Sequence, residues 1–332
     1  MRILFSAHDA GGAHAIVPVV VALKAAGVDV IVRADGPAAD ICASRGIATS
    51  TRTAFAEGAD AYIFGTSAGE TIEKAIFLSV QGRMPTVAVL DYWSNYAVRF
   101  SRRDRDFAYL PDRICVMDDI ARDEMIAEGF DPARIVVTGN PHFDHFADAI
   151  TSDREDAKRL LFISQPLSVM AREPGYAAYP FDEFTALADV VAACKIVLPE
   201  YRLAIRSHPK ERAGKYKRVL DDRVALAKEA TLEQALSRSG LIVGMNSVVL
   251  LQAVAAGKPV LSYEPGLKGP DPLVSNRLGV TRSVHSSAEL ADALERYASG
   301  TLPVPERSMR DVWPPGATER VVEAALSLIR EK

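Results

Sequence analysis

Short apolar runs alternate along the chain with longer stretches whose apolar positions have helical spacing. Apolar runs at 3–7 and 28–32 flank a stretch with helical spacing over 14–26, which ends at Gly27. The same order recurs, with strands expected at 61–64, 86–90, 114–117, 135–138, 160–164, 203–206, 224–227, 241–243 and 260–263. Helices are expected at 37–44, 68–81, 119–128, 181–198, 232–237, 248–256, 288–298 and 317–331. Strands that alternate with helices predict an α/β protein with mostly parallel sheets covered on both faces.

The pattern runs through two such series, with a polar, helical-looking stretch over 144–158 between them. We therefore expect a Rossmann-like domain at 1–150 and a second one at 151–315. The segment 316–332 reads as a C-terminal helix that packs across the domain junction. The carboxyl ends of the two sheets would then line one interdomain cleft, which is where open α/β sheets bind ligands.

The most informative stretch runs over 240–264, where an apolar run ends at Gly244 and a second apolar segment follows. Asn246 or Ser247 is placed to cap the start of a helix, and Gly257 is placed to end it. A helix that starts at the end of a strand presents free N–H groups and a positive dipole end, which favour a phosphate. An ordinary strand–helix–strand unit with an ordinary cap explains the same pattern.

The first strand leads into a loop that contains two glycines and three polar side chains that could face the cleft. Gly11 and Gly12 would let the backbone approach a ligand closely. Asp9 is a candidate general base by position, and His14 or His8 is the alternative. The loop lacks the G-x-G-x-x-G pattern, so a nicotinamide dinucleotide fingerprint is absent. The alternative is that both residues are structural, with Asp9 as a helix cap and His14 on the helix surface.

Aromatic and polar residues gather directly after the strand expected at 86–90. Asp91 and Asn95 flank Tyr92 and Trp93, a combination that is common in carbohydrate or acceptor sites. Asp91 is also a second candidate for the base. The alternative is that these aromatic residues fill the domain junction.

Cationic and polar residues follow two strands of the second half. Gln165 comes after the strand at 160–164, and Arg206, His208 and Lys210 surround the end of the strand at 203–206. Together with the helix start at Ser247, these cations are what a diphosphate needs for charge neutralisation.

Composition narrows the classes of partner. The chain has 332 residues, with 39 basic and 43 acidic side chains and a net charge of -4, which gives no electrostatic footprint for nucleic acid. Its three cysteines, Cys42, Cys115 and Cys194, are too far apart for metal-ligand spacing and are expected to be reduced core residues. No export leader or membrane span is expected, so we expect a cytoplasmic protein. A basic cluster leaves a peripheral membrane contact open, with a solvated loop as the alternative: Arg99, Arg102, Arg103 and Arg105.

Several motifs occur in an order that resembles the GT-B glycosyltransferase superfamily. These are the glycine-rich first loop, Thr-Gly-Asn-Pro at 138–141, His-Pro at 208–209, and Asn-Ser at 246–247 followed by Gly-Lys-Pro-Val at 257–260. Within that superfamily they look most like bacterial CMP-sugar transferases of the sialyl, polysialyl and Kdo type, and like CDP-glycerol glycerophosphotransferases. The Thr-Gly-Asn and Gly-Lys-Pro-Val segments are also similar to UDP-N-acetylglucosamine 2-epimerases, although those have Asp-Ser-Gly-Gly where this chain has Met245-Asn-Ser-Val248.

The resemblance implies a nucleotide-sugar donor bound in the second domain and an acceptor bound over the first. Glu264 would accept a hydrogen bond from the ribose or the donor sugar. Asp9 or Asp91 would deprotonate a hydroxyl of a glycan, lipid-linked or protein acceptor, and the cations near His208 would stabilise the departing phosphate. The transfer would be inverting and independent of a metal or other cofactor. The alternatives are a sugar-nucleotide 2-epimerase or hydrolase of the same fold, and a non-catalytic nucleotide-binding relative.

Overall fold

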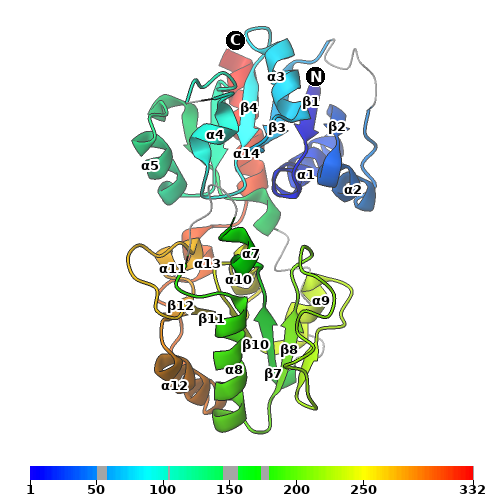
Figure 1. The fold of residues 1–332 in the computed structure, drawn as a ribbon. Coiled ribbons are helices and arrows are strands. Elements are labelled where there is room, and N and C mark those ends of the chain that lie inside the picture. Colours follow the sequence, from blue (N-terminus) through cyan, green and yellow to red (C-terminus); the bar gives the residue numbers. More distant parts are fainter. Residues whose placement is uncertain (51–57, 104, 145–155, 173–178, 332) are drawn as a thin grey trace. The chain divides into compact units, whose positions relative to one another are not determined.

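The computed structural model describes residues 1–50, 58–103, 105–144, 156–172 and 179–331. The chain divides into two units, Met1–His145 with Trp313–Lys332, and Phe146–Val312. Figure 1 shows both units, and each is described by itself below. The segment 145–155, where the sequence places the domain boundary, lies outside the described residues. Within the described part of the chain, no helix combines the length and apolarity needed to cross a membrane.

Unit 1 is built on a parallel sheet of six strands in the order β2-β1-β3-β4-β5-β6. The strands are β1 (Arg2–Ala7), β2 (Asp29–Ala34), β3 (Ala61–Gly65), β4 (Thr86–Val89), β5 (Arg113–Val116) and β6 (Ile135–Val137). The connecting helices are α1 (Ala10–Ala25), α2 (Gly36–Ser44), α3 (Ile72–Val80), α4 (Tyr96–Phe100) and α5 (Asp119–Ala127), with short 3₁₀ turns at Pro132–Arg134 and Pro141–Phe143. The strand order reverses between β1 and β3, which is the switch point where doubly wound sheets bind ligands.

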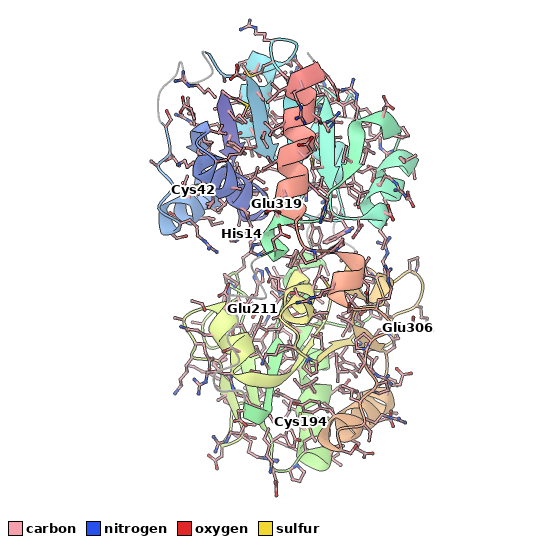
Figure 2. All side chains as sticks on the ribbon, turned by 180° about the vertical axis from the view of Figure 1, so that it is seen from behind. His14, Cys42, Cys194, Glu211, Glu306 and Glu319 are labelled. Carbon is pink, nitrogen blue, oxygen red and sulfur yellow. The ribbon has the colours of Figure 1, made fainter. Side chains whose placement is uncertain are left out.

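The C-terminal helix α14 (Ala317–Glu331) belongs to unit 1 and lies across one face of its sheet (Figure 2). Its apolar residues Val321 and Ala325 join one core with Ile3 and Phe5 of β1 and with Ile16 of α1. The carboxylate of Asp144 accepts hydrogen bonds from the first N–H groups of the helix, those of residues 316 to 318, at 2.7 to 3.1 Å. These contacts fix the start of α14, because the first N–H groups of a helix have no partner within it. The expected packing across the domain junction stays a prediction.

Unit 2 repeats the architecture, with a parallel sheet in the order β12-β11-β10-β7-β8-β9. Its strands are β7 (Asp156–Ile163), β8 (Arg202–Arg206), β9 (Val224–Leu226), β10 (Ser239–Gly244), β11 (Val260–Tyr263) and β12 (Arg282–Val284). The helices are α7 (Leu167–Met170), α8 (Glu183–Val197), α9 (Leu232–Ser237), α10 (Val248–Ala255), α11 (Val274–Arg277), α12 (Ser287–Ala298) and α13 (Met309–Val312). Here the strand order reverses between β7 and β10.

Alternate residues of the central strands of unit 2 fill one core beneath α8 and α12. Leu160 and Phe162 of β7 contribute to it, as do Leu241 and Val243 of β10. The side chains of a strand alternate between its two faces, and the intervening residues Leu161 and Ile242 are also buried, as expected where both faces are covered. The cysteines Cys42, Cys115 and Cys194 are free thiols in the cores, as the sequence predicts.

Two local expectations are wrong. The glycine-rich loop is short, because α1 already begins at Ala10 and takes Gly11 and Gly12 into its first turn. The helical pattern over 144–158 is wrong for its last residues, because β7 begins at Asp156. Residues 145–155 lie outside the described residues.

Candidate functional site

The carboxyl edge of the sheet in unit 2 brings most of the predicted donor-binding residues together. Gly244, the last residue of β10, pairs in register with Ile163 of β7 and Ser262 of β11, and Ile163 pairs with Arg206 of β8. The residues that follow these strands therefore share one edge: Ser164, Gln165, His208, Asn246, Ser247 and Glu264. This edge includes the switch point between β7 and β10.

Helix α10 begins at this edge with Ser247 as its N-cap, and the Ser247 side chain accepts the N–H of Val249 at 3.3 Å. Asn246 donates its amide N–H to the hydroxyl of Tyr179 at 3.0 Å. A Cβ at Gly244 would stand 2.9 Å from Leu250, so glycine lets the helix pack closely on β10. Gly257 has a φ of +71° after the helix, which confirms the stop predicted there.

The imidazole of His208 is held in one tautomer by its own turn. Its Nδ1 accepts the backbone N–H of Lys210 at 3.1 Å, so in the neutral ring the proton is on Nε2. Burial lowers the pKa of His208, and the positive charges of Lys210 and Lys215 lower it further, against the opposing effect of Glu211. His208 is therefore a neutral hydrogen-bond donor at neutral pH.

A buried network that the sequence reading missed supports this turn. Glu211 accepts the backbone N–H of His208 at 3.0 Å, and it also accepts the hydroxyl groups of Ser164 at 2.7 Å and Tyr216 at 2.9 Å. Lys215 pairs with Glu211 at 2.8 Å and with the fully buried Glu183. The available signal was a glutamate three positions after His208 in a Ser-His-Pro-Lys-Glu turn, which marks a side chain that can return to its own turn.

The other predicted phosphate ligands differ in their surroundings. The guanidinium group of Arg206 donates to the backbone carbonyl of Glu229 at 2.6 Å, which directs it toward the segment after β9. Lys210 is exposed. The Oε1 atom of Gln165 is buried and has no hydrogen-bond partner in the part of the chain that the structure describes. The phosphate contacts of these residues stay predictions.

Glu264 is fully buried at the end of β11, and no donor reaches its carboxyl oxygens within the described ranges. Burial and, after it, the neighbouring carboxyl of Asp271 raise the pKa of Glu264 to about 8. Asp271 is itself held by the N–H of Leu273 at 2.8 Å and the amide of Asn276 at 2.9 Å. A buried acid without a cation is costly, so this position is suited to a ligand that brings hydrogen-bond donors.

At the carboxyl edge of unit 1, Asp91 is the candidate base whose carboxylate is held by hydrogen bonds. Its Oδ1 accepts from the guanidinium of Arg99 at 2.7 Å and from the hydroxyl of Thr66 at 3.2 Å. Its Oδ2 lies against α1, where a Cβ on Gly11 would come within 1.8 Å of it. A Cβ on Gly12 would likewise stand 3.1 Å from the backbone nitrogen of Thr66, directly after β3. Tight helix–strand packing thus accounts for both glycines, and their contact with a donor stays a prediction.

The other residues of the first loop separate into different environments. Asp9 occupies the N-cap position of α1, although its side chain makes no capping hydrogen bond. His8 pairs with Asp35 at 2.7 Å. His14 lies on α1 with its ring centroid 4.5 Å from that of His142. Burial and, to a smaller degree, His14 lower the pKa of His142 to about 3.

Trp93 packs into the interior of unit 1. It is 7% exposed, stacks on Trp313 with ring centroids 5.3 Å apart, and donates its indole N–H to Asp118 at 2.9 Å. Tyr92 meets Trp93 edge-on and is half-buried, while Asn95 is exposed with a φ of +57°. The stacking on Trp313 and the hydrogen bond to Asp118 therefore give Trp93 a structural role. The acceptor contacts of Trp93, Tyr92 and Asn95 stay predictions. No cluster of metal-ligating side chains is found in the ranges that the structure describes.

Two parallel six-stranded sheets with these switch points define the GT-B-like class of two Rossmann domains, and comparison with solved structures gives the same class. A Listeria monocytogenes protein described as a UDP-N-acetylglucosamine 2-epimerase superposes with a TM-score of 0.71 at 16% identity, over 100% of this chain and 97% of that one. The UDP-GlcNAc 2-epimerase of Neisseria meningitidis, bound to UDP-GlcNAc, gives 0.67 at 13% identity, over 98% and 100%. The glycosyltransferase of kitacinnamycin gives 0.56 at 14% identity, over 99% and 95%.

These likenesses confirm the predicted fold, an α/β protein of the GT-B type. No protein-family model and no curated protein sequence matches the chain. At identities of 13 to 16%, the superpositions show a shared fold and leave the activity to be argued from the residues.

Proposed function

We propose that the protein is a nucleotide-sugar enzyme that binds a UDP-sugar at the carboxyl edge of unit 2 and acts on that sugar without a second substrate, as a 2-epimerase or hydrolase. One observation carries the proposal. Three groups lie at one sheet edge: a neutral His208 with its proton on Nε2, the start of α10 at Ser247, and the buried acid Glu264, whose carboxyl oxygens receive no donor from the described residues. They supply a donor and a helix dipole for a diphosphate and an acceptor for hydroxyl groups.

The comparisons support a reaction without an acceptor. Two of the three superposed proteins are described as 2-epimerases, and one of these was crystallised with UDP-GlcNAc. Inversion at C2 of a UDP-sugar needs a general base. As the base takes the C2 proton, the electrons of that C–H bond form a C1=C2 double bond and the C1–O bond to UDP breaks. UDP then returns to C1 as a proton is delivered to the other face of C2. Asp91 suits the role of the base, because Arg99 and Thr66 fix its carboxylate. His208 and the start of α10 would stabilise the phosphate that leaves.

A glycosyltransferase is the second candidate, and two observations favour it. The chain has Met245-Asn-Ser-Val248 at the start of α10, where the resemblance leads us to expect Asp-Ser-Gly-Gly in 2-epimerases, and the superposed proteins include a glycosyltransferase. In this reading Asp91 or Asp9 deprotonates an acceptor hydroxyl near Tyr92 and Asn95. The CMP-sugar donors that the sequence resemblance suggests belong to this candidate.

The experiment that tests the proposal is incubation of the protein with UDP-GlcNAc in D₂O, followed by proton NMR and without any acceptor. A second UDP-sugar with deuterium at C2 would establish epimerisation, and free sugar with UDP would establish hydrolysis. If the sugar of UDP-GlcNAc is consumed only after an acceptor is added, the protein is a glycosyltransferase and the proposal is wrong.

Nucleotide binding is checked independently by thermal unfolding in the presence of UDP, CMP and CDP. A ligand at one hundred times its dissociation constant adds about 2.7 kcal/mol to the stability of the protein. Stabilisation by CMP or CDP but not by UDP would contradict a UDP-sugar. If no nucleotide stabilises the protein and no sugar nucleotide is consumed, the proposal fails.

A further inference from the structure

We propose that a cationic cavity in unit 1 binds the phosphate group of a phosphorylated ligand, either a soluble molecule or a lipid headgroup. The cavity has a volume of about 560 Å³ and lies beside the residues that follow β3 and β4. Four cations and two acids take part in its lining: Lys74, Arg102, Arg103, Arg105, Glu70 and Glu128. The cavity lies within unit 1, whereas the nucleotide site is proposed for unit 2.

The buried member of this set is Lys74, which is 3% exposed. Its ammonium group donates to the carbonyl of Val98 at 3.3 Å and lies 5.1 Å from the ring centroid of Tyr109. No ion pair of Lys74 is found between residues that the structure describes. Burial lowers the pKa of Lys74, and the carboxyl groups of Glu70 and Glu73 oppose that shift, so an anion bound in the cavity would favour the ammonium form further.

The two acids that line the cavity are already engaged by neutral donors. Glu70 accepts the hydroxyl of Tyr109 at 2.9 Å, and Glu128 accepts the backbone N–H of Ala97 at 3.0 Å. Four cations therefore face two carboxylates in the lining. The excess of positive charge favours an anion.

The loop that carries the arginines is held by its own hydrogen bonds. Asp106 accepts the N–H groups of Arg102 at 2.8 Å and Ala108 at 3.1 Å, and Ser101 accepts that of Phe107 at 3.2 Å. Arg105 has a φ of +58° and Phe107 one of +48°, which are costly for residues with a Cβ. These hydrogen bonds hold the described residues on either side of position 104.

The guanidinium groups of this loop remain accessible. Arg103 and Arg105 are exposed, and neither forms an ion pair with another described residue. Arginine forks match the oxygens of a phosphate in geometry, and the lysine adds a point charge. The volume of the cavity exceeds that of a bare phosphate, which indicates a phosphate attached to a larger group.

The test compares wild type with the double variant Arg103→Ala/Arg105→Ala and the control Arg122→Ala. Arg122 is an arginine of unit 1 that pairs with Asp119 and Asp123 and does not line the cavity. Calorimetric titration with inorganic pyrophosphate is expected to show affinity at least about tenfold weaker for the double variant, because charge-assisted hydrogen bonds are lost. The control should match wild type. A pyrophosphate site in unit 2 would contribute equally to all three proteins.

A second arm distinguishes the source of the phosphate. Co-sedimentation is measured with phosphatidylcholine vesicles and with vesicles that also contain phosphatidylglycerol. Binding of wild type to the anionic vesicles alone, lost in the double variant, assigns the cavity to a lipid headgroup, while pyrophosphate binding without vesicle binding assigns it to a soluble phosphate. The proposal is overturned if the double variant matches wild type in both assays, or if Arg122→Ala weakens binding as much as the double variant.

Discussion

Glu211 accepts a hydrogen bond from the backbone N–H of His208 at 3.0 Å, and its other oxygen accepts the hydroxyl of Ser164 at 2.7 Å. One buried carboxylate thus links the turn after β8 to the end of β7. We expect Glu211→Gln to lower the free energy of unfolding by about 1–3 kcal/mol, because one buried donor loses its partner. It should also weaken UDP binding, because the position of His208 depends on that turn. Denaturant unfolding and calorimetry measure the two effects.

The matched control is Glu200→Gln, which removes an exposed glutamate paired with Lys158 at the surface of the same unit. Surface ion pairs contribute little, so its unfolding and its UDP affinity should equal those of wild type. Unchanged UDP affinity in Glu211→Gln would show that the network supports only the fold.

His208→Ala should lower turnover by about 10²–10⁴-fold if His208 stabilises the departing phosphate. Ser207→Ala, at the exposed neighbouring position, should keep wild-type turnover. Burial lowers the pKa of His208, so the ring stays neutral as the pH falls below its ordinary value of 6.5. Turnover measured against pH should therefore fall on the acid side only below pH 6.5, where His208 takes up a proton. A fall that begins above pH 6.5 would contradict the assignment.

The sequence predicts the order of the strands from β1 to β11 and of the longer helices, because both periods are local. Each of these strands reads as an apolar run, and many turns are marked by glycine or proline, as at Gly27 and Gly257. The helix start at Ser247 was predictable for the same reason, since a cap is set by its neighbours in sequence. The strand β12 and the short helices α4, α7, α11 and α13 were not predicted, since segments of three to five residues carry too little periodicity.

The partners of the candidate residues were not predictable, because they come from distant parts of the chain. Gly11 was expected to face a ligand, and the structure places Asp91 against it. Trp93 was expected to contact an acceptor, but its indole N–H finds Asp118 after β5. The position of Asp271 beside Glu264 likewise depends on how the segment after β11 folds back. Periodicity carries no information on such contacts.

Gly11→Ala tests the contact between α1 and Asp91. A Cβ at this position would lie 1.8 Å from Asp91 Oδ2, so the carboxylate must move away from its place beside Arg99. We expect turnover to fall at least about tenfold, since displacement of a catalytic group by about 1 Å can cost about a hundredfold. Gly69→Ala is the control, because its Cβ would meet no atom closer than 3.9 Å. Equal turnover in both variants would remove Asp91 from the proposed reaction.

His142 makes the stability of unit 1 sensitive to acid. Its pKa is lowered to about 3, whereas an unfolded chain binds the proton near 6.5, so the unfolded state takes up the proton first. The stability that this group contributes is complete above pH 6.5 and falls by about 1.4 kcal/mol per pH unit below it. Wild type should lose about 2 kcal/mol between pH 6.5 and pH 5 from this group. His142→Phe, which keeps a ring beside His14, should lack that loss.

The control for this titration is His8→Gln, where the sign is opposite. The hydrogen bond to Asp35 raises the pKa of His8, so its contribution is complete below pH 6.5 and is lost as the pH rises through the folded pKa. Urea unfolding of the three proteins across pH 5 to 8 separates the effects. Parallel curves for wild type and His142→Phe would show that His142 does not cause the acid sensitivity.

Glu264 should make the stability of the folded protein depend on pH. Its pKa is about 8 in the folded protein against an ordinary 4.5, so the proton favours the folded state and stability falls as the pH rises between these values. Glu264→Gln removes this titration, and its stability should gain on wild type by up to about 1.4 kcal/mol per pH unit in that window. Glu295→Gln, an exposed change on α12, should follow wild type.

Ionisation of Glu264 should also make the affinity for UDP depend on pH, which tests its contact with the nucleotide more directly than stability does. If a ribose hydroxyl donates to ionised Glu264, binding below pH 8 requires that this carboxyl group lose its proton, which weakens the observed affinity. UDP affinity should therefore rise as the pH is raised from 6 to 8. In Glu264→Gln the affinity should be weaker at pH 8 and should not rise with pH. Calorimetric titration of both proteins with UDP at several pH values measures this. A rise that persists in Glu264→Gln would assign the pH dependence to another group and leave Glu264 as a buried acid without contact to the nucleotide.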